Sequence, residues 1–353
     1  MYKNLLLLLV SSIISLGVLE FTLRVLMPER LAFVPALEND TLTYLPNQQQ
    51  RARHLEWDHV IKINGDGFRN DKNLSEIPDR TILVLGDSFP EGYGVSLEDA
   101  FPKQLERMLR NHEPKAHVYN AGHSGTGLPY YRRIYRAIFQ PVQQIDRVII
   151  SFFIGNDTLN TPNPPSGLLQ AGNAFGDGWL YKLKVFLGSR VATYAVLNHV
   201  IKTNPVLDKV CKKFGACDQP PPLSIYASPV INSAIPHTLA FLNSLVEEIR
   251  ADGRKVMVLM IPTREQVDDK RWQQAAHEFK DRIGTHRLMM NERIYDGLRS
   301  AGIDVVDFTG IALDYHRNHP ESLYFEYDGH WTAPGHAVAA AKLAAFVEHA
   351  WRH

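Results

Sequence analysis

The sequence predicts an α/β fold built on a parallel β-sheet. Five segments have the apolar character of strands, and several are nearly continuous apolar runs, as expected for parallel strands covered on both faces. Helical patterns lie between these segments, and strands that alternate with helices form right-handed βαβ units. The five expected strands are residues 81–85, 116–120, 147–153, 255–261 and 304–308.

Three helices are expected beside or after these strands. Apolar residues recur at helical spacing over residues 101–109 and 239–249, and Gly253 is the expected stop after the second of these segments. Residues 333–351 are expected to form the last helix, because Pro334 suits a first helical turn and an alanine-rich stretch follows it.

The N-terminal segment is apolar but interrupted. Residues 5–19 carry no charge, whereas Glu20 and Arg24 break the run that follows, and no small-residue cleavage site comes after it. A membrane-spanning helix needs about 20 apolar residues. We predict an uncleaved signal anchor or transmembrane helix over residues 1–26; a cleaved signal peptide and a helix docked on the domain are the alternatives. Residues 27–79 are expected to be a stalk and a lead-in to the main domain.

The main domain is expected to occupy residues 80–353 and to carry one insertion. Residues 158–235 are too long for an ordinary connection between strands, so we predict an inserted cap or lid. The only two cysteines, Cys211 and Cys217, lie in this insertion. Outside the cytoplasm they are able to close a small disulfide, and two unpaired thiols are the alternative.

The overall composition is that of an ordinary globular protein. Of the 353 residues, 45% are hydrophobic and 22% are charged, which is enough apolar material for a sizeable core. Lysine plus arginine and aspartate plus glutamate number 38 each, so the formal net charge is zero. The chain therefore lacks the excess of positive charge that is typical of nucleic-acid-binding proteins.

Glycines and polar residues follow the expected strands at one edge of the sheet. Ser88 follows the first strand, Gly125 the second and Asn156 the third, while Asp328 and His330 lie between the fifth strand and the last helix. Open parallel sheets bind ligands at the carboxyl ends of their strands. We therefore expect these residues to meet in one crevice.

These residue types suit acyl transfer. A serine hydroxyl becomes a nucleophile when a histidine takes its proton and a carboxylate orients the imidazole, and donors must face the developing oxyanion. The Ser88 backbone N–H, the Gly125 N–H and the Asn156 side-chain amide are candidate donors. Taken singly, Ser88 also suits a helix N-cap and Asn156 an ordinary turn. Asp157 is expected to brace its loop.

Four short blocks contain these residues. They are Gly86-Asp87-Ser88-Phe89, Asn120-Ala121-Gly122-His123-Ser124-Gly125, Gly155-Asn156-Asp157 and Asp328-Gly329-His330-Trp331. In this order they resemble the conserved blocks of the SGNH hydrolases, also called the GDSL family. The resemblance spans residues 80–350, and Phe89 takes the place of the leucine that usually follows Gly-Asp-Ser.

The resemblance implies both a fold and a set of roles. The fold is a flavodoxin-like, three-layer α/β/α sandwich with about five parallel strands, and neither a metal ion nor an organic cofactor is implied. Ser88 is the implied nucleophile and His330 the general base. Gly125 and Asn156 complete the oxyanion hole with the Ser88 N–H.

The acid of the implied triad departs from the common pattern. Many members place aspartate three residues before the histidine, where this chain has Tyr327. Asp328, two residues before His330, resembles the arrangement of SGNH-like proteins that handle O-acetyl groups on exported polysaccharides. Asp328 is the acid we expect, and Glu326 is the alternative.

Several other residues near the expected crevice are given structural roles. His123 and His336 are the nearest rivals of His330 among the 15 histidines. His123 is able to line the pocket but lies too close to the second strand to need a catalytic role, and packing or capping is expected of His336. Trp331 is expected in the core rather than against a sugar ring. Solvated surface positions are expected for two charged residues, Arg69 and Glu91.

The sequence thus predicts a serine esterase that removes short acyl groups, such as acetyl, from an extracytoplasmic glycan or another small ester. The expected location is the bacterial inner membrane, single-pass, with the catalytic domain on the periplasmic side. The alternatives are an O-acetyltransferase that modifies an exported polysaccharide and a non-catalytic carbohydrate-binding or assembly protein on the same fold. No nucleic-acid partner is expected, and the oligomeric state stays open.

Overall fold

The computed structural model divides into two compact units, each described by itself. The first comprises Met1–Val34, Gln50–Leu55 and Gly172–Pro220, and the second comprises Pro35–Gln49, Glu56–Ala171 and Pro221–His353. The described residues are 2–26, 43–44, 46–53, 56–158, 191–204, 206–207, 210, 229–278, 280, 284–326 and 328–351.

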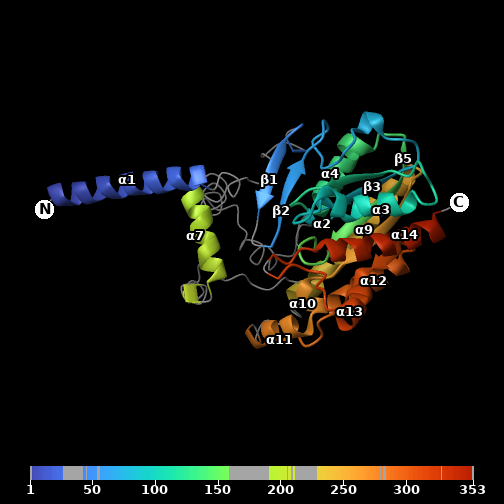
Figure 1. Ribbon diagram of the computed structural model, residues 1–353. Helices are drawn as coiled ribbons and strands as arrows, with labels where there is room; N and C mark the ends of the chain where they lie inside the picture. Colours follow the sequence, from blue (N-terminus) through green and yellow to red (C-terminus); the bar gives the residue numbers. More distant parts are fainter. Residues whose placement is uncertain are drawn as a thin grey trace. The chain divides into compact units, whose positions relative to one another are not determined.

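A five-stranded parallel sheet forms the centre of the second unit (Figure 1). Its strand order is β4-β3-β5-β6-β7, the doubly wound order of flavodoxin-like folds. The predicted parallel sheet and its strand count are confirmed. The strands are β3 (Thr81–Gly86), β4 (Val118–Gly122), β5 (Ile145–Phe153), β6 (Lys255–Ile261) and β7 (Asp304–Asp307).

The near-continuous apolar strands bury both of their faces. In β3, Ile82 and Val84 pack into one hydrophobic cluster, whereas Leu83 and Leu85 pack into another. This alternation follows from the two-residue period of a strand, which sends successive side chains to opposite faces. A strand covered on both faces therefore shows no polar alternation in sequence.

Helices cover both faces, which makes the predicted three-layer sandwich. One face packs against α4 (Leu128–Ile134), α9 (Pro229–Ala251) and α12 (Met289–Ser300). The other face packs against α3 (Phe101–Leu109), α13 (Phe308–Asn318) and α14 (Ala333–Ala350). Shorter elements of this unit are β2 (Asp58–Lys62), η2 (Leu74–Glu76), α2 (Ser88–Glu91), η3 (Leu97–Asp99), the π-helical η4 (Tyr135–Phe139), α10 (Arg264–Val267) and α11 (Asp269–Glu278).

Part of the predicted lead-in belongs to the second unit. The Asn64 side-chain oxygen accepts hydrogen bonds from the N–H groups of Asp66 (3.1 Å) and Phe68 (2.9 Å), which closes the turn. Gly67 has φ 83°, a left-handed conformation that favours glycine. Tyr44 and Phe68 are buried. Residues 43–44 and 56–79 of the predicted lead-in thus lie in the same unit as the sheet.

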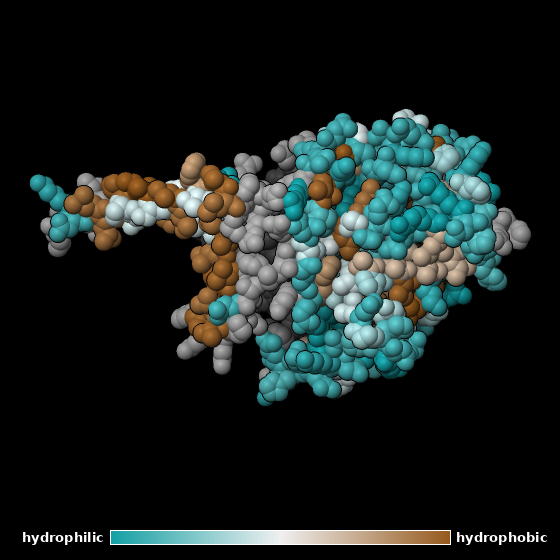
Figure 2. Space-filling view, in the orientation of Figure 1, coloured by the Kyte–Doolittle hydropathy of each residue, from teal (hydrophilic) through white to brown (hydrophobic). Residues whose placement is uncertain are grey.

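The first unit contains α1 (Tyr2–Leu26), α7 (Ala192–Thr203) and most of β1 (Gln49–Arg53). Glu20 accepts hydrogen bonds from the Thr193 N–H and hydroxyl, both at 2.9 Å, so α1 and α7 contact each other. Apolar side chains are exposed on both helices, among them Leu7, Phe21 and Leu197 (Figure 2).

The prediction of a transmembrane helix over residues 1–26 is not supported. The segment is helical, but within the described residues no helix is both long enough and apolar enough to cross a membrane. The apolar run over residues 5–19 stops at Glu20, whose carboxylate pairs with Arg24 at 2.7 Å. That ion pair places charge within the last two turns of α1.

Most of the predicted insertion lies outside the described residues. Within residues 158–235 the structure describes α7, a few residues after it and the beginning of α9, so a cap or lid stays a prediction. Cys211 and Cys217 also lie outside the described residues, so a disulfide between them stays a prediction.

Candidate active site

Ser88, His330 and Asp328 form one hydrogen-bonded chain. The Ser88 hydroxyl oxygen lies 2.7 Å from Nε2 of His330, although 242 positions separate the two residues. On the other side of the ring, His330 Nδ1 contacts the Asp328 carboxylate, which also accepts the His330 backbone N–H at 3.2 Å. This is the geometry that a serine nucleophile, a histidine base and an orienting carboxylate require.

Ser88 is presented by a sharp turn from strand to helix. β3 ends at Gly86, and Ser88 is the first residue of α2. Asp87, rather than Ser88, is the N-cap, and its carboxylate accepts the Phe89 N–H at 3.0 Å. The capping role considered for Ser88 is therefore taken by its neighbour, and the Ser88 hydroxyl faces His330.

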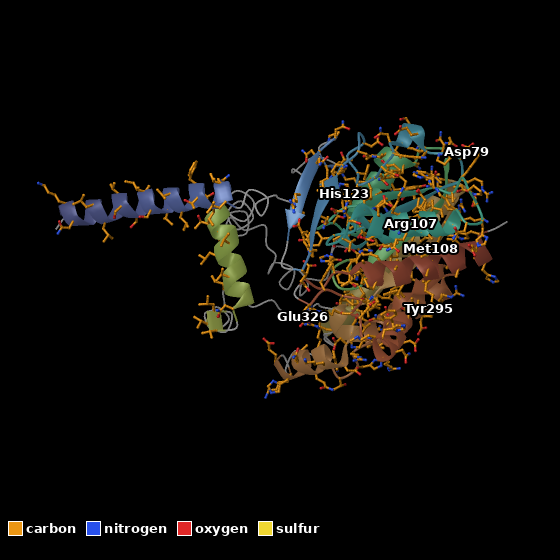
Figure 3. All side chains as sticks on the ribbon, in the orientation of Figure 1. Asp79, Arg107, Met108, His123, Tyr295 and Glu326 are labelled. Atoms are coloured by element: carbon orange, nitrogen blue, oxygen red, sulfur yellow. The ribbon has the colours of Figure 1, made fainter. Side chains whose placement is uncertain are left out.

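Only one of the two candidate acids contacts the imidazole. Asp328 reaches His330 Nδ1, whereas the Glu326 carboxylate pairs with Arg271 at 2.5 Å. Glu326 is an exposed residue of the loop that follows α13 (Figure 3). The geometry thus favours Asp328 over the alternative.

Aromatic rings flank the imidazole on two sides. The Phe89 ring centroid lies 5.2 Å and the Tyr93 ring centroid 4.6 Å from that of His330. The His330 side chain is nevertheless 26% exposed, and Ser88 is 8% exposed. The rings restrict the orientation of the imidazole while the site stays open to solvent.

The candidate oxyanion donors occupy the expected strand ends. Gly125 has φ 75° and is exposed, and a Cβ built on it meets no atom within 4 Å, so glycine is required there by backbone conformation rather than by crowding. The Asn156 side-chain amide donates to the Asp87 carboxylate at 3.3 Å. Asp87 therefore links Asn156 to the turn that carries Ser88.

Two buried carboxylates lie beneath this side of the site. Burial raises the pKa of both Asp87 and Asp157, and the nearby Asp87 carboxylate raises the pKa of Asp157 further. Asp157 accepts hydrogen bonds from the Phe153 N–H (2.9 Å) and the Tyr131 hydroxyl (3.0 Å). Asp157 thus braces the loop after β5, as expected.

The prediction of solvated surface positions for Arg69 and Glu91 is wrong. Arg69 is 1% exposed and Glu91 is fully buried. Glu91 accepts the Ser124 N–H at 2.5 Å and the Tyr44 hydroxyl at 2.9 Å, and burial raises its pKa. It therefore holds the loop that leads to Gly125.

Arg69 stabilises the end of α2. Its guanidinium donates to the backbone oxygens of Glu91 (3.0 Å), Gly92 (2.6 Å) and Val95 (2.7 Å). Charged residues are almost never fully buried unless paired, so composition favours exposure for both Arg69 and Glu91. The one local signal is that Arg69 directly follows Phe68 in the turn-rich lead-in.

The remaining candidates pack in the core, as predicted for His336 and Trp331. His123 is buried and its ring stacks on Tyr44 at 4.2 Å (Figure 3), while burial lowers its pKa to about 3. His336 accepts the Phe101 N–H at 3.2 Å, and burial lowers its pKa to about 3. Trp331 is fully buried, with its ring centroid 4.6 Å from that of Phe308.

One family model matches the C-terminal part of the chain. A family model described as "SGNH hydrolase-like domain, acetyltransferase AlgX" matches residues 225–353. That range includes Asp328 and His330 and excludes Ser88. No curated protein matches the chain.

Solved structures of esterases also match, at low identity. The lipase/acylhydrolase from Enterococcus faecalis is 13% identical, with 76% of this chain and 96% of that chain covered and a TM-score of 0.42. The acetyl xylan esterase AlAXEase is 12% identical, with 76% and 99% covered and a TM-score of 0.43.

Proposed function

We propose that this protein is a serine-dependent enzyme that cleaves acyl esters. Ser88 is the nucleophile, His330 is the general base, and Asp328 is the acid that orients the His330 imidazole. The observation that carries the proposal is the hydrogen-bonded chain from the Ser88 hydroxyl through both ring nitrogens of His330 to Asp328. A hydroxyl, an imidazole and a carboxylate in this order are the standard means of activating a serine.

The reaction proceeds in two acyl transfers. The Ser88 oxygen attacks the ester carbonyl carbon while its proton passes to His330 Nε2. The ester C–O bond then breaks, and the protonated His330 returns that proton to the departing alcohol. A water molecule attacks the acyl-serine, loses a proton to His330 and releases the carboxylic acid, and Ser88 regains its proton.

Donors at three strand ends support the proposed oxyanion hole. They are the N–H groups of Ser88 and Gly125 and the Asn156 amide, and one such donor typically contributes about 3 kcal/mol to the transition state. We propose short acyl groups such as acetyl as substrates and a glycan or another small ester as their carrier. An exported glycan as carrier places the enzyme outside the cytoplasm.

Hydrolysis of an aryl acetate tests the proposal. Replacement of the nucleophile in Ser88→Ala is expected to lower kcat/KM by at least about 10³-fold, because no acyl-enzyme forms. The exposed Ser300 on α12 provides the matched control, and Ser300→Ala is expected to keep the wild-type rate. Equal rates for wild type and Ser88→Ala would refute Ser88 as the nucleophile, and absence of hydrolysis by wild type would favour a non-catalytic carbohydrate-binding protein.

An O-acetyltransferase is the second candidate, favoured by the acetyltransferase-type family model over residues 225–353. In that reaction a sugar hydroxyl replaces water as the attacking group, and the same three residues serve. The acceptor separates the two activities. Faster decay of the acyl-enzyme and formation of an acetylated oligosaccharide on addition of acceptor would identify the transferase.

A further inference from the structure

Glu56 binds the backbone of the loop that carries Asp328. Its two carboxylate oxygens accept the Glu326 N–H at 2.5 Å and the Asp328 N–H at 3.3 Å, across about three-quarters of the chain. Glu56 lies just before β2, in the region predicted to be a lead-in. Hydrogen bonds to a charged acceptor are about twice as strong as neutral ones.

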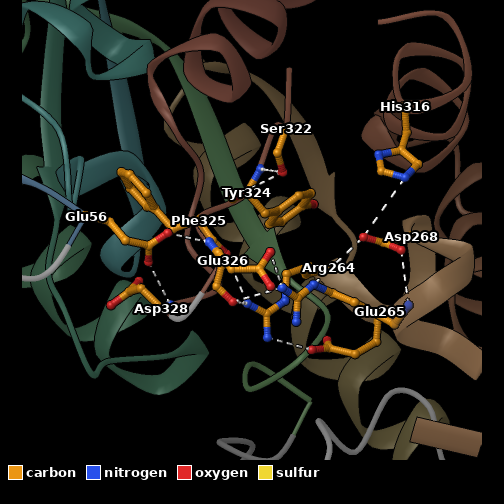
Figure 4. Close-up of polar contacts among 11 residues, drawn as sticks. Glu56, Arg264, Glu265, Asp268, His316, Ser322, Tyr324, Phe325, Glu326 and Asp328 are labelled. Atoms are coloured by element: carbon orange, nitrogen blue, oxygen red, sulfur yellow. Dashed lines mark hydrogen bonds and ion pairs between the residues drawn. The ribbon is translucent and has the colours of Figure 1, made fainter. Parts of the chain in front are cut away.

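The opposite edge of the same loop is held by two arginines (Figure 4). Arg264, at the start of α10, donates to the carbonyl oxygens of Phe325 (3.0 Å) and Glu326 (2.6 Å). Arg271, in α11, donates to the Glu326 carbonyl at 2.9 Å. A carboxylate on the N–H groups and guanidinium groups on the carbonyls thus hold the loop from both edges.

The loop needs external support because of its own sequence. Gly329, between Asp328 and His330, has φ 86°, and a Cβ built there meets nothing closer than 3.8 Å. A glycine without close neighbours leaves the backbone at this point free to change conformation. Within the loop, the Asp328 carboxylate accepts the His330 N–H across this glycine at 3.2 Å, and groups outside the loop add to this support.

Trp57, the residue after Glu56, contacts His330 indirectly through the Tyr93 ring. The Trp57 ring lies 5.2 Å from the Tyr93 ring in an edge-on arrangement, and Tyr93 in turn lies 4.6 Å from His330. Edge-to-face ring pairs contribute about 1 kcal/mol beyond the area they bury. Residues 56–57 thus support the acid loop directly and the imidazole through Tyr93.

We propose that Glu56 is a positioning residue, which fixes Asp328 against the Nδ1 side of His330 by binding the Glu326 and Asp328 N–H groups. Its consequence for rate rests on the proposed function, whereas its consequence for the Asp328–His330 hydrogen bond does not. Loss of Glu56 leaves the loop free to carry Asp328 away from the ring, and small displacements of catalytic groups cost up to about 10²-fold in rate.

Two variants of Glu56 and one control test this role in the full chain. Glu56→Ala removes both acceptors, whereas Glu56→Gln keeps the shape and one acceptor oxygen, so it is the variant least disturbing to folding. Glu321→Gln, exposed in the same segment, removes one negative charge without a contact to the Glu326 or Asp328 N–H groups. The first readout is the low-field proton NMR signal of the hydrogen that His330 shares with Asp328, assigned by its loss in Asp328→Asn.

The second readout is the hydrolysis of an aryl acetate. We expect kcat to fall about 10-fold in Glu56→Gln and about 10²-fold in Glu56→Ala, with KM little changed, because the lost effect is in the transition state. The low-field signal should weaken in the same order, and Glu321→Gln should match wild type in both readouts.

The two readouts separate the positioning role from the proposed function. An unchanged low-field signal in both Glu56 variants would overturn the role of Glu56, whatever the enzyme does. A weakened signal in a protein without Ser88-dependent ester hydrolysis would support the role of Glu56 and refute the proposed function. Equal weakening of the signal in Glu321→Gln would attribute the effect to charge alone and also overturn the proposal.

Discussion

Two histidines of the second unit, His330 and His123, differ in their surroundings. His330 has a hydroxyl on one ring nitrogen, a carboxylate on the other, and a side chain that is 26% exposed. His123 is fully buried against Tyr44, and neither of its ring nitrogens has a hydrogen bond of regular geometry to the described residues. A base needs a partner for each nitrogen and access for the substrate, and only the His330 region offers both.

Replacement of each histidine by phenylalanine is the strongest test of this difference between His330 and His123. Phenylalanine keeps an aromatic ring against Tyr93 in His330→Phe and against Tyr44 in His123→Phe, but it accepts no proton. We expect kcat/KM for an aryl acetate to fall by about 10³-fold or more in His330→Phe, because Ser88 loses its base. In His123→Phe the expected loss is below about threefold.

Equal losses in the two variants would contradict the assignment of different roles. Circular dichroism and thermal unfolding of both proteins provide the control, because a loss of activity counts only in a folded variant. A loss of activity in His123→Phe but not in His330→Phe would identify His123, beside Ser124, as the general base.

A second test concerns the carboxylate that orients His330. Asp328→Asn keeps the shape of the side chain but removes the negative charge that selects the Nδ1–H tautomer, so we expect a loss of about 10³-fold in kcat. Glu326→Gln, two residues away, removes an equal charge from a side chain that binds Arg271, and the expected change is within about threefold. Aryl acetate kinetics of the two variants measure both effects. A larger effect of Glu326→Gln would make the alternative acid the correct one.

Much of the fold is readable from the sequence because its signals are local. The predicted strand 255–261 coincides with β6, and the prediction 116–120 for β4 differs by two residues from Val118–Gly122. Apolar runs separated by helical patterns fix both the sheet and the edge at which Ser88 and Asn156 emerge. The order of the short blocks along the chain supplies the rest.

The supports of the site were not predicted because they depend on contacts between distant segments. Glu91 is buried because the Ser124 N–H and the Tyr44 hydroxyl, 33 and 47 positions away, meet its carboxylate. Asp328 rather than Glu326 meets His330 because the Glu326 carboxylate pairs with Arg271, 55 positions away. Neither contact has a periodic or compositional signal. The transmembrane prediction followed a local apolar run that ends at the Glu20–Arg24 pair, and no described helix is long and apolar enough to cross a membrane.

The pH dependence of the free energy of unfolding tests the burial of His123, and the expected effect is the smallest of those predicted. Burial holds the pKa of His123 at about 3, whereas an unfolded histidine titrates near 6.5. Between these values the unfolded chain binds a proton that the folded chain does not. The contribution of His123 to the free energy of unfolding is therefore complete above about pH 6.5 and is lost as the pH falls toward 3.

Urea unfolding at a series of pH values, in wild type and His123→Phe, measures this contribution. Removal of one such group should reduce the slope of the free energy of unfolding against pH by about 1.4 kcal/mol per pH unit between pH 6 and pH 4. His336 is buried in the same way and stays intact in both variants, so the difference between the curves reports His123 alone. Parallel curves for wild type and His123→Phe would mean that the His123 ring takes up its proton in the folded protein as readily as in the unfolded one, and the contrast with His330 would then rest on hydrogen-bond partners only.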